Sequence, residues 1–140
     1  MSKDCIFCDI VAGRIPCTKV YEDADTLAFM DIGPVTRGHT LVIPKEHLDP
    51  ITSVPPDMLG KLILTVQKVA RAHLKGLGAE GINVTQANGE IAGQAIPHVH
   101  FHVIPRTKRD TPAHNWEPGK YSGTDEINLY AGKIRNAMEK

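Results

Sequence analysis

The stretch "HVHFHVIPR", residues 98–106, alternates three histidines with apolar side chains. Side chains of an extended strand point to opposite faces in turn, so residues two apart share a face at a spacing of roughly 6.6 Å. The pattern therefore predicts a strand with one imidazole face and one apolar face that packs beneath a helix. The imidazole face consists of His98, His100 and His102, and the apolar face of Val99, Phe101 and Val103.

Three explanations for the row of imidazoles compete: a metal site, a half-buried strand on which the histidines have no function, and a row of nitrogens directed at a substrate. A strand with a complete apolar face has no structural need for three imidazoles on its other face, where threonine, lysine or glutamate would serve as well. Imidazole titrates near neutral pH and acts as a nucleophile, an acid or a base. The strict alternation therefore points to chemistry.

A glycine-rich loop, "ANGEIAGQAIP" at residues 87–97, directly precedes this row. Gly89 and Gly93 lack Cβ atoms, so their backbone N–H groups can approach an anion closely. A histidine nucleophile that faces such a loop suggests attack on phosphorus. The composition of the loop alone is a weak signal, because a hairpin loop can look the same. Its position beside the histidines strengthens the signal, and no G-x-S-x-G sequence indicates a serine nucleophile instead.

Hydrophobic periodicity predicts the elements on either side. The predicted strands span residues 18–23, 26–32, 38–44, 81–87 and 97–105, and the predicted helices span residues 5–13, 53–78 and 124–140. The long helix has apolar residues three and four positions apart and ends at two glycines. Strands in runs with segregated helices are typical of an α+β protein with an antiparallel sheet.

The composition limits the classes of function. The 140 residues include 16 basic and 16 acidic side chains, so the formal net charge is zero. A general nucleic-acid binder usually carries a basic excess. No run approaches the ~18 consecutive apolar residues of a membrane helix, and the N-terminal apolar run is too short for a signal peptide. We therefore expect a cytoplasmic protein without a nucleic-acid or membrane partner.

Two segments carry a resemblance to a known family: "CIFCDIVAGRIPCTKVYEDADTLAFMDIGPVTRGHTLVIPKEH" at residues 5–47 and "NGEIAGQAIPHVHFHVIPR" at residues 88–106. The histidine row and its flanking sequence resemble the histidine triad family, in particular its branch of small nucleotide-binding hydrolases. The family signature alternates three histidines with apolar residues, and "HVHFHVI" fits it at every position. The resemblance implies an α+β fold with an antiparallel sheet of about five strands, one long helix, a short N-terminal helix and a C-terminal helix. It covers residues 5–106 of one expected domain, 1–140, and leaves 107–140 as a C-terminal segment.

The resemblance also implies a reaction. His100 would attack the α-phosphorus of a purine nucleoside 5′-phosphate derivative, such as a phosphoramidate or a dinucleoside polyphosphate, and form a covalent nucleotidyl-histidine that water resolves. His102 and His39 would flank the phosphate, and Gln94 would line its path. The implied catalytic set is His39, Gln94, His98, His100 and His102.

The nucleotide itself would lie in an apolar slot, which suits a flat base, with a few polar groups that fix its orientation. Asp31 would accept hydrogen bonds from the ribose hydroxyls. The implied nucleotide-binding set is Ile6, Phe7, Ile10, Phe29, Asp31, Ile32, Asn88 and Gly93. Two positions depart from the family pattern: Ala87 stands where relatives often carry Asn or Gln, and Ala95 where they often carry Ser or Thr. Asn88 is a candidate to compensate.

Three cysteines are an odd number for a disulfide scaffold, and the pair in "CIFC" has the spacing of half a metal site. The resemblance to bacterial-type members implies that Cys5, Cys8, His47 and His98 hold a structural zinc ion in a tetrahedral Cys2His2 site. The alternative is two partly buried free thiols and a surface histidine. No organic cofactor is expected.

In the resembled branch, two subunits join their sheets as a homodimer, and "HNWEPG" at residues 114–119 is similar to a C-terminal segment that reaches toward the partner's active site. Two other functions compete with the hydrolase. A non-enzymatic, zinc-stabilised module that binds nucleotides or a partner is compatible with Ala87 and Ala95. Nucleotidylyltransferases that act on sugar phosphates typically have glutamine at the position of His102, which disfavours that class.

Overall fold

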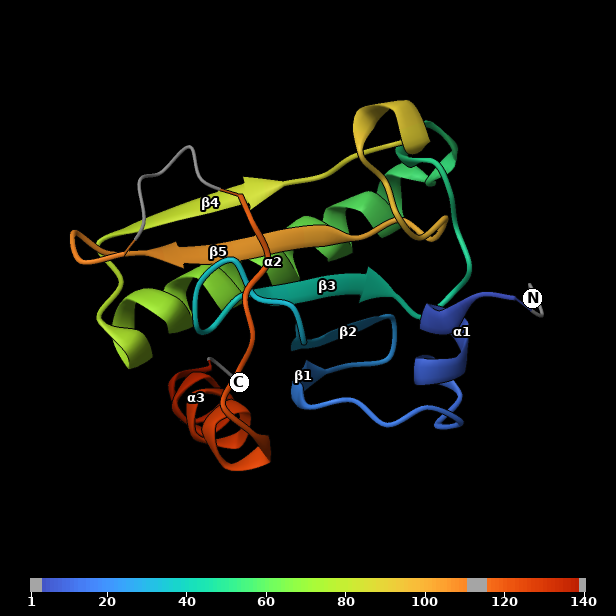
Figure 1. Cartoon of the computed structure of the whole chain (residues 1–140). Helices are drawn as coiled ribbons and strands as arrows, with labels where there is room; N and C mark the ends of the chain where they lie inside the picture. Colours follow the sequence, from blue (N-terminus) through green and yellow to red (C-terminus); the bar gives the residue numbers. More distant parts are fainter. Residues whose placement is uncertain (1–3, 111–115, 139–140) are drawn as a thin grey trace.

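The computed structural model describes residues 4–110 and 116–138. Five strands form one antiparallel sheet in the order β1-β2-β3-β5-β4 (Figure 1). The strands are β1 (Lys19–Glu22), β2 (Thr26–Met30), β3 (Thr40–Pro44), β4 (Gly81–Thr85) and β5 (Phe101–Arg106). The helices are α1 (Ile6–Val11), α2 (Pro56–Leu77) and α3 (Thr124–Ala137), with 3-10 turns at Ile51–Ser53 and Glu90–Ala92. The predicted α+β fold, with five strands, one long helix and a shorter helix near each end of the chain, is confirmed.

The two faces of the sheet are buried in two separate hydrophobic clusters. One cluster joins the sheet to α2 and α3, and the other joins it to α1. Neighbouring residues of β2 alternate between them: Ala28 and Met30 belong to the first, and Leu27 and Phe29 to the second. Because α1 is short, it covers only one end of its face (Figure 1), and this open face also carries the imidazoles.

The histidine segment keeps the predicted alternation but begins its strand later than expected. Val99, Phe101 and Val103 are buried in the cluster under α2. Regular pairing starts only at Phe101, since the N–H of Val99 donates to the carbonyl of Leu48 at 2.7 Å rather than to a neighbouring strand. His98 and His100 therefore precede β5, with His98 in a bend, and only His102 lies within the strand.

Local sequence explains the limits of α2. Proline occupies the first helical position, Asp57 lies in the first turn, and Gly78 ends the helix with a left-handed φ of 66°. The last helix ends at Ala137, and residues 139–140 of the predicted range lie outside the described residues. Within the described parts of the chain, none of the helices combines the length and the apolar character that a membrane crossing requires.

Two glycines of α2 provide a test of the α2–α3 contact. A Cβ atom on Gly76 would lie 2.5 Å from the carbonyl oxygen of Lys133 in α3, whereas one on Gly60 would meet nothing within 4 Å. We expect Gly76→Ala to lower the free energy of unfolding by about 1–3 kcal/mol through overpacking. The matched control Gly60→Ala should raise it by about 0.5–1 kcal/mol, because alanine favours the helix. Urea denaturation measures both, and equal effects of the two substitutions would contradict this packing.

Candidate active site and metal cluster

A cavity of about 330 Å³ opens on the face of the sheet opposite α2. Most of the predicted nucleotide-binding residues line it, together with two of the imidazoles. Those members are Ile6, Phe7, Ile10, Phe29, Asp31, Ile32, Gly93, His100 and His102. Sequence reasoning missed other lining residues, among them Ile15, Pro16, Cys17 and Leu41. A second cavity, of about 460 Å³, is lined by Thr36, Arg37 and Thr107 among others and by none of the predicted site residues.

Two predicted residues, Gln94 and Asn88, do not line the cavity that contains His100 and His102. The side-chain amide of Gln94 donates to Asp49 Oδ1 at 2.7 Å and accepts from the N–H of Gly89 at 2.7 Å. Asn88 Oδ1 accepts from the N–H of Ile51 at 2.8 Å. Both side chains therefore brace the glycine-rich loop against the segment after β3.

The glycine N–H groups expected to meet an anion already have partners. The N–H of Gly89 donates to Gln94, and the N–H of Gly93 donates to the carbonyl of Glu90 at 2.9 Å. Both glycines adopt positive φ angles, 87° and 98°, that favour glycine over other residues. Their role in this conformation is to shape the loop, and Gly93 contributes to the cavity wall.

The protonation of His100 follows from one short hydrogen bond. Its Nδ1 lies 2.7 Å from the carbonyl oxygen of His98. A carbonyl oxygen only accepts hydrogen bonds, so Nδ1 carries the proton and the Nε2 of the neutral ring is unprotonated. The ring is buried and meets the edge of Phe7 at a centroid distance of 5.0 Å. The arrangement leaves a nucleophilic nitrogen in a cavity with mainly apolar walls.

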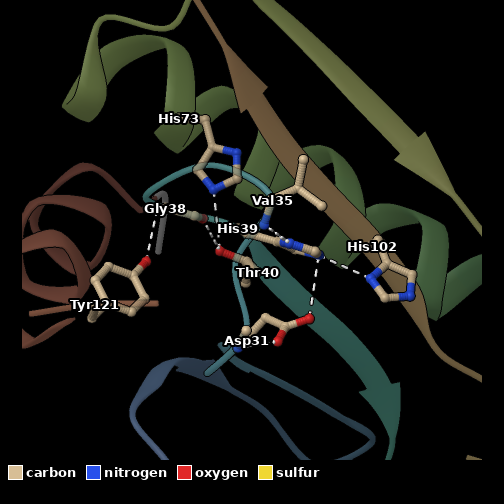
Figure 2. A network of polar contacts seen from close by, with 9 residues as sticks. Asp31, Val35, Gly38, His39, Thr40, His73, His102 and Tyr121 are labelled. Carbon is tan, nitrogen blue, oxygen red and sulfur yellow. Dashed lines mark hydrogen bonds and ion pairs between the residues drawn. The ribbon is translucent and has the colours of Figure 1, made fainter. Parts of the chain in front are cut away.

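His39 and His102 form a second pair whose tautomers are also defined (Figure 2). The N–H of Val35 donates to His39 Nδ1 at 3.0 Å, so the neutral ring of His39 is protonated at Nε2. That nitrogen lies 2.9 Å from His102 Nδ1 and donates to it. His102 is therefore protonated at Nε2 in its neutral form. The ring centroids of His100 and His102 are 5.1 Å apart, so a ring with an unprotonated nitrogen lies beside a ring with an N–H donor.

Burial keeps this pair uncharged. It lowers the pKa of His39 to about 4. The pKa of His102 is also lowered to about 4, mainly by burial and further by the neighbouring imidazoles. Asp31 Oδ2 lies 3.5 Å from His39 Nε2, and burial raises the pKa of this carboxyl while the N–H of Gly33 opposes the shift. At neutral pH, His39 and His102 therefore act through N–H dipoles rather than through positive charge.

The four predicted metal ligands lie together at the N-terminal end of α1. Cys8 Sγ lies 3.3 Å from His47 Nδ1 and 3.7 Å from His98 Nδ1, and Cys5 Sγ lies 3.3 Å from His98 Nδ1. Ideal tetrahedral zinc with thiolate and imidazole ligands places sulfur and nitrogen about 3.6 Å apart. His98 Nε2 donates to the carbonyl of Pro44 at 2.9 Å, which leaves Nδ1 unprotonated and directed at the sulfurs. The residues present fit a zinc ion.

A second cluster, Asp31, His39 and His102, has similar interatomic distances but different chemistry. The Nε2 atom of His39 carries a proton because Val35 occupies its Nδ1 lone pair. A protonated nitrogen cannot ligate a metal, so this cluster does not fit one. The two predicted roles of His98 can also be separated: its ring belongs to the metal cluster, and its carbonyl oxygen orients the ring of His100.

Comparison with known proteins agrees with this geometry. The model of the HIT domain family matches residues 12–109, which is more than half of the chain. The chain belongs to the HIT family. An uncharacterised HIT-like protein of Methanocaldococcus jannaschii is 45% identical over 88% of this chain and 95% of its own length. The adenosine 5′-monophosphoramidase of Schizosaccharomyces pombe is 46% identical over 76% of this chain and 77% of its own length.

A solved structure shows the same fold. The chain matches the crystal structure of a Zn-bound histidine triad family protein from Mycobacterium smegmatis with a TM-score of 0.85 and 36% identity, over 96% of this chain and 92% of that one. The resemblance to the HIT family that the histidine motif indicates is thus confirmed, and so is the fold it implies.

Proposed function

We propose that this HIT family protein is a nucleotide hydrolase or transferase that acts on purine nucleoside 5′-phosphate derivatives, with phosphoramidates and dinucleoside polyphosphates as candidate substrates. The observation that carries the proposal is the bond between His100 Nδ1 and the carbonyl of His98, which leaves Nε2 as a nucleophile inside the cavity. The activity named for the S. pombe relative supports the same class of substrate.

In the proposed reaction, His100 Nε2 attacks the α-phosphorus, and a bond between nitrogen and phosphorus forms as the bond to the leaving group breaks. The Nε2–H group of His102 donates a hydrogen bond to the phosphoryl group, where negative charge accumulates. His39 holds His102 in the tautomer that this requires, through the contact of 2.9 Å. Water then breaks the bond to His100 and releases the nucleoside monophosphate.

The walls of the cavity support a purine nucleotide as ligand. Phe7, Ile10 and Phe29 are buried and form an apolar floor, while Ile6 and Ile32 are exposed at its mouth. A flat base between these groups would cover the exposed side chains and gain hydrophobic free energy. Asp31 lines the same cavity, with Oδ1 bound to the N–H of Gly33, and Oδ2, which lies 3.5 Å from His39 Nε2, has a further lone pair for a ribose hydroxyl.

A non-enzymatic nucleotide- or partner-binding module is the second candidate, because Ala95 presents a methyl group to the cavity where relatives often carry a hydroxyl. It predicts nucleotide binding without turnover. The expected cytoplasmic location, the absence of an organic cofactor and the absence of a nucleic-acid partner stay predictions.

His100→Ala tests the catalytic proposal. On adenosine 5′-phosphoramidate, we expect kcat to fall by at least about 10³-fold, because the nucleophile is removed. Calorimetry should show that the variant still binds AMP. Cys17→Ser, which alters the same cavity away from the histidines, is the control and should keep most of the activity. Rapid quenching and mass spectrometry should detect one nucleotidyl group on His100 of the wild type. An inactive wild type, or an active His100→Ala protein, would contradict the proposal.

We further propose that Cys5, Cys8, His47 and His98 hold one structural zinc ion, as the ligand distances and the Zn-bound M. smegmatis neighbour support. The ion would link α1 to the segment that precedes β5. The zinc ion would act only as a structural cross-link between these segments and would take no part in the proposed reaction.

The zinc proposal predicts a contrast between two cysteines. Cys8→Ser should lower the zinc content from about one ion per chain to a trace and lower the melting temperature by roughly 10 °C, because the cross-link is lost. Cys17→Ser should leave the zinc content unchanged and lower the melting temperature much less, since Cys17 lies outside the metal cluster and is only partly buried. Metal analysis of protein purified without chelators measures the content, and zinc-free wild-type protein would refute the assignment.

We also propose a homodimer that forms through β4 and α2. β4 is an edge strand of the sheet, and it contacts α2. Exposed apolar side chains lie on both elements, namely Ile63 and Leu74 on α2 and Val84 on β4. An edge strand with apolar surroundings is suited to pair with a second copy.

Sedimentation equilibrium tests this dimer. Val84→Lys should convert the protein from dimer to monomer, because it places a charge at the centre of the proposed interface. The control Leu129→Lys alters an exposed leucine on α3 and should leave the dimer intact. A monomeric wild-type protein, or equal effects of the two substitutions, would exclude this interface.

A further inference from the structure

A segment near the C-terminus holds the loop that carries Asp31 and His39 into the site. We name residues 31–39 the site loop and residues 117–126 the clamp segment. Three polar contacts join them, each from a different position of the loop. The N–H of Gly119 donates to the carbonyl of Pro34 at 2.7 Å, the N–H of Gly38 donates to Tyr121 Oη at 2.9 Å, and Arg37 Nε donates to Glu126 Oε2 at 2.9 Å.

The contact between the two segments is also tight. A Cβ atom on Gly119 would lie 3.1 Å from the carbonyl of Pro34, closer than most Cβ atoms approach a neighbour, and one on Gly33 would make ordinary contact with the side chain of Pro118 at 3.5 Å. Glu126 is held in place for Arg37, since its other carboxylate oxygen accepts from the N–H of Ser122 at 2.8 Å. The clamp segment therefore matches the loop in shape as well as in hydrogen bonding.

Gly38 connects the clamp segment to the active site, because it binds Tyr121 and directly precedes His39. It has a φ of 104°, and a Cβ atom there would clash with the side chain of Leu77. Its N–H has the hydroxyl of Tyr121 as its partner. Figure 2 shows Tyr121 reaching Gly38 from one side, while His39, Asp31 and His102 meet on the other. A shift of Gly38 would move the adjacent His39 directly.

The tautomer of His39 depends on this loop. The N–H of Val35, within the same loop, selects Nδ1 as the acceptor and Nε2 as the donor of the neutral ring, and the carboxylate of Asp31, 3.5 Å from Nε2, favours the same tautomer. If the loop moves and this bond lengthens, the proton can occupy either nitrogen. His39 then no longer donates reliably to His102 Nδ1, and His102 no longer presents a fixed N–H to the cavity.

We propose that Tyr121 is a positioning residue for the active site: its hydroxyl holds Gly38 and thereby keeps His39 in the tautomer that orients His102. This inference rests on the proposed hydrolase function. Tyr121 lies beyond residues 12–109, the part of the chain that the HIT domain model matches. It does not line the cavity, so it acts through the loop and not on the substrate.

Tyr121→Phe removes the hydroxyl and keeps the ring. Tyr130→Phe is the matched control, because Tyr130 lies in α3 with its ring 6.2 Å from that of Tyr121. Nitrogen-15 NMR of the imidazole rings gives a readout that does not depend on turnover. We expect one His39 tautomer, with unprotonated Nδ1, in the wild type and in Tyr130→Phe, and a mixture of tautomers in Tyr121→Phe.

Kinetics on adenosine 5′-phosphoramidate give the second readout, at a temperature at which every variant is folded. Tyr121→Phe should lower kcat roughly 5- to 20-fold, with the Kd for AMP within about twofold of the wild-type value, since a transition-state interaction is weakened and binding is not. Tyr130→Phe should match the wild type. Glu126→Gln weakens the ion pair with the exposed Arg37. It should change the His39 tautomer ratio and kcat in the same direction as Tyr121→Phe, but by a smaller factor. This variant provides the test if Tyr121→Phe does not fold.

The two proposals fail in different ways. If the wild type has no activity, the proposed function is wrong, and the NMR measurement still decides whether Tyr121 controls His39. If the wild type is active and Tyr121→Phe keeps a single His39 tautomer or the full kcat, the positioning role is overturned while the hydrolase function stands.

Discussion

The hydrogen bond from His100 Nδ1 to the carbonyl of His98 is the constraint on which the site depends. It joins the backbone of one residue to the ring of the residue two positions later, in the segment that leads into β5. That segment is secured on the opposite face, where Val99 is fully buried and its N–H binds the carbonyl of Leu48. The protonation state of a reactive nitrogen is therefore set by how the core packs beneath it.

The metal cluster is connected to the same bond. His98 contributes its ring to the cluster, with Nε2 bound to the carbonyl of Pro44, and its own carbonyl to His100. Fixing both ring nitrogens of His98 restricts rotation of the residue and so the direction of its carbonyl. A zinc ion at this position would thus stabilise the orientation of His100, the proposed nucleophile, while taking no part in the proposed reaction. The metal cluster and the cavity are therefore connected through His98.

The sequence predicts what depends on local periodicity and misses what depends on distant partners. Alternation from His98 to Val103 correctly assigns both faces, because burial on a strand follows a period of two. It does not reveal that pairing begins only at Phe101, which the distant carbonyl of Leu48 decides. Nor does it reveal that the side chain of Gln94 donates to Asp49, which is far away in the sequence. The hydrogen bond from the N–H of Val35 to His39 cannot be predicted from the sequence either, since every residue except proline has a backbone N–H group.

The electrostatics of the site favour stabilisation of a phosphate by neutral hydrogen-bond donors rather than by positive charge. Burial depresses the pKa values of His39 and His102 to about 4, so the pair offers the oriented N–H group of His102 without net charge. A cationic pair would bind substrate, product and transition state alike, and uniform binding does not raise kcat. Fixed dipoles in a low-dielectric cavity interact most strongly where charge develops during transfer, and they need no reorganisation when it does. For the proposed reaction, a neutral site also lets the charged product leave. The buried, hydrogen-bonded placement of His39 therefore serves the proposed chemistry, which gives a reason for the clamp segment to hold the site loop from outside the cavity.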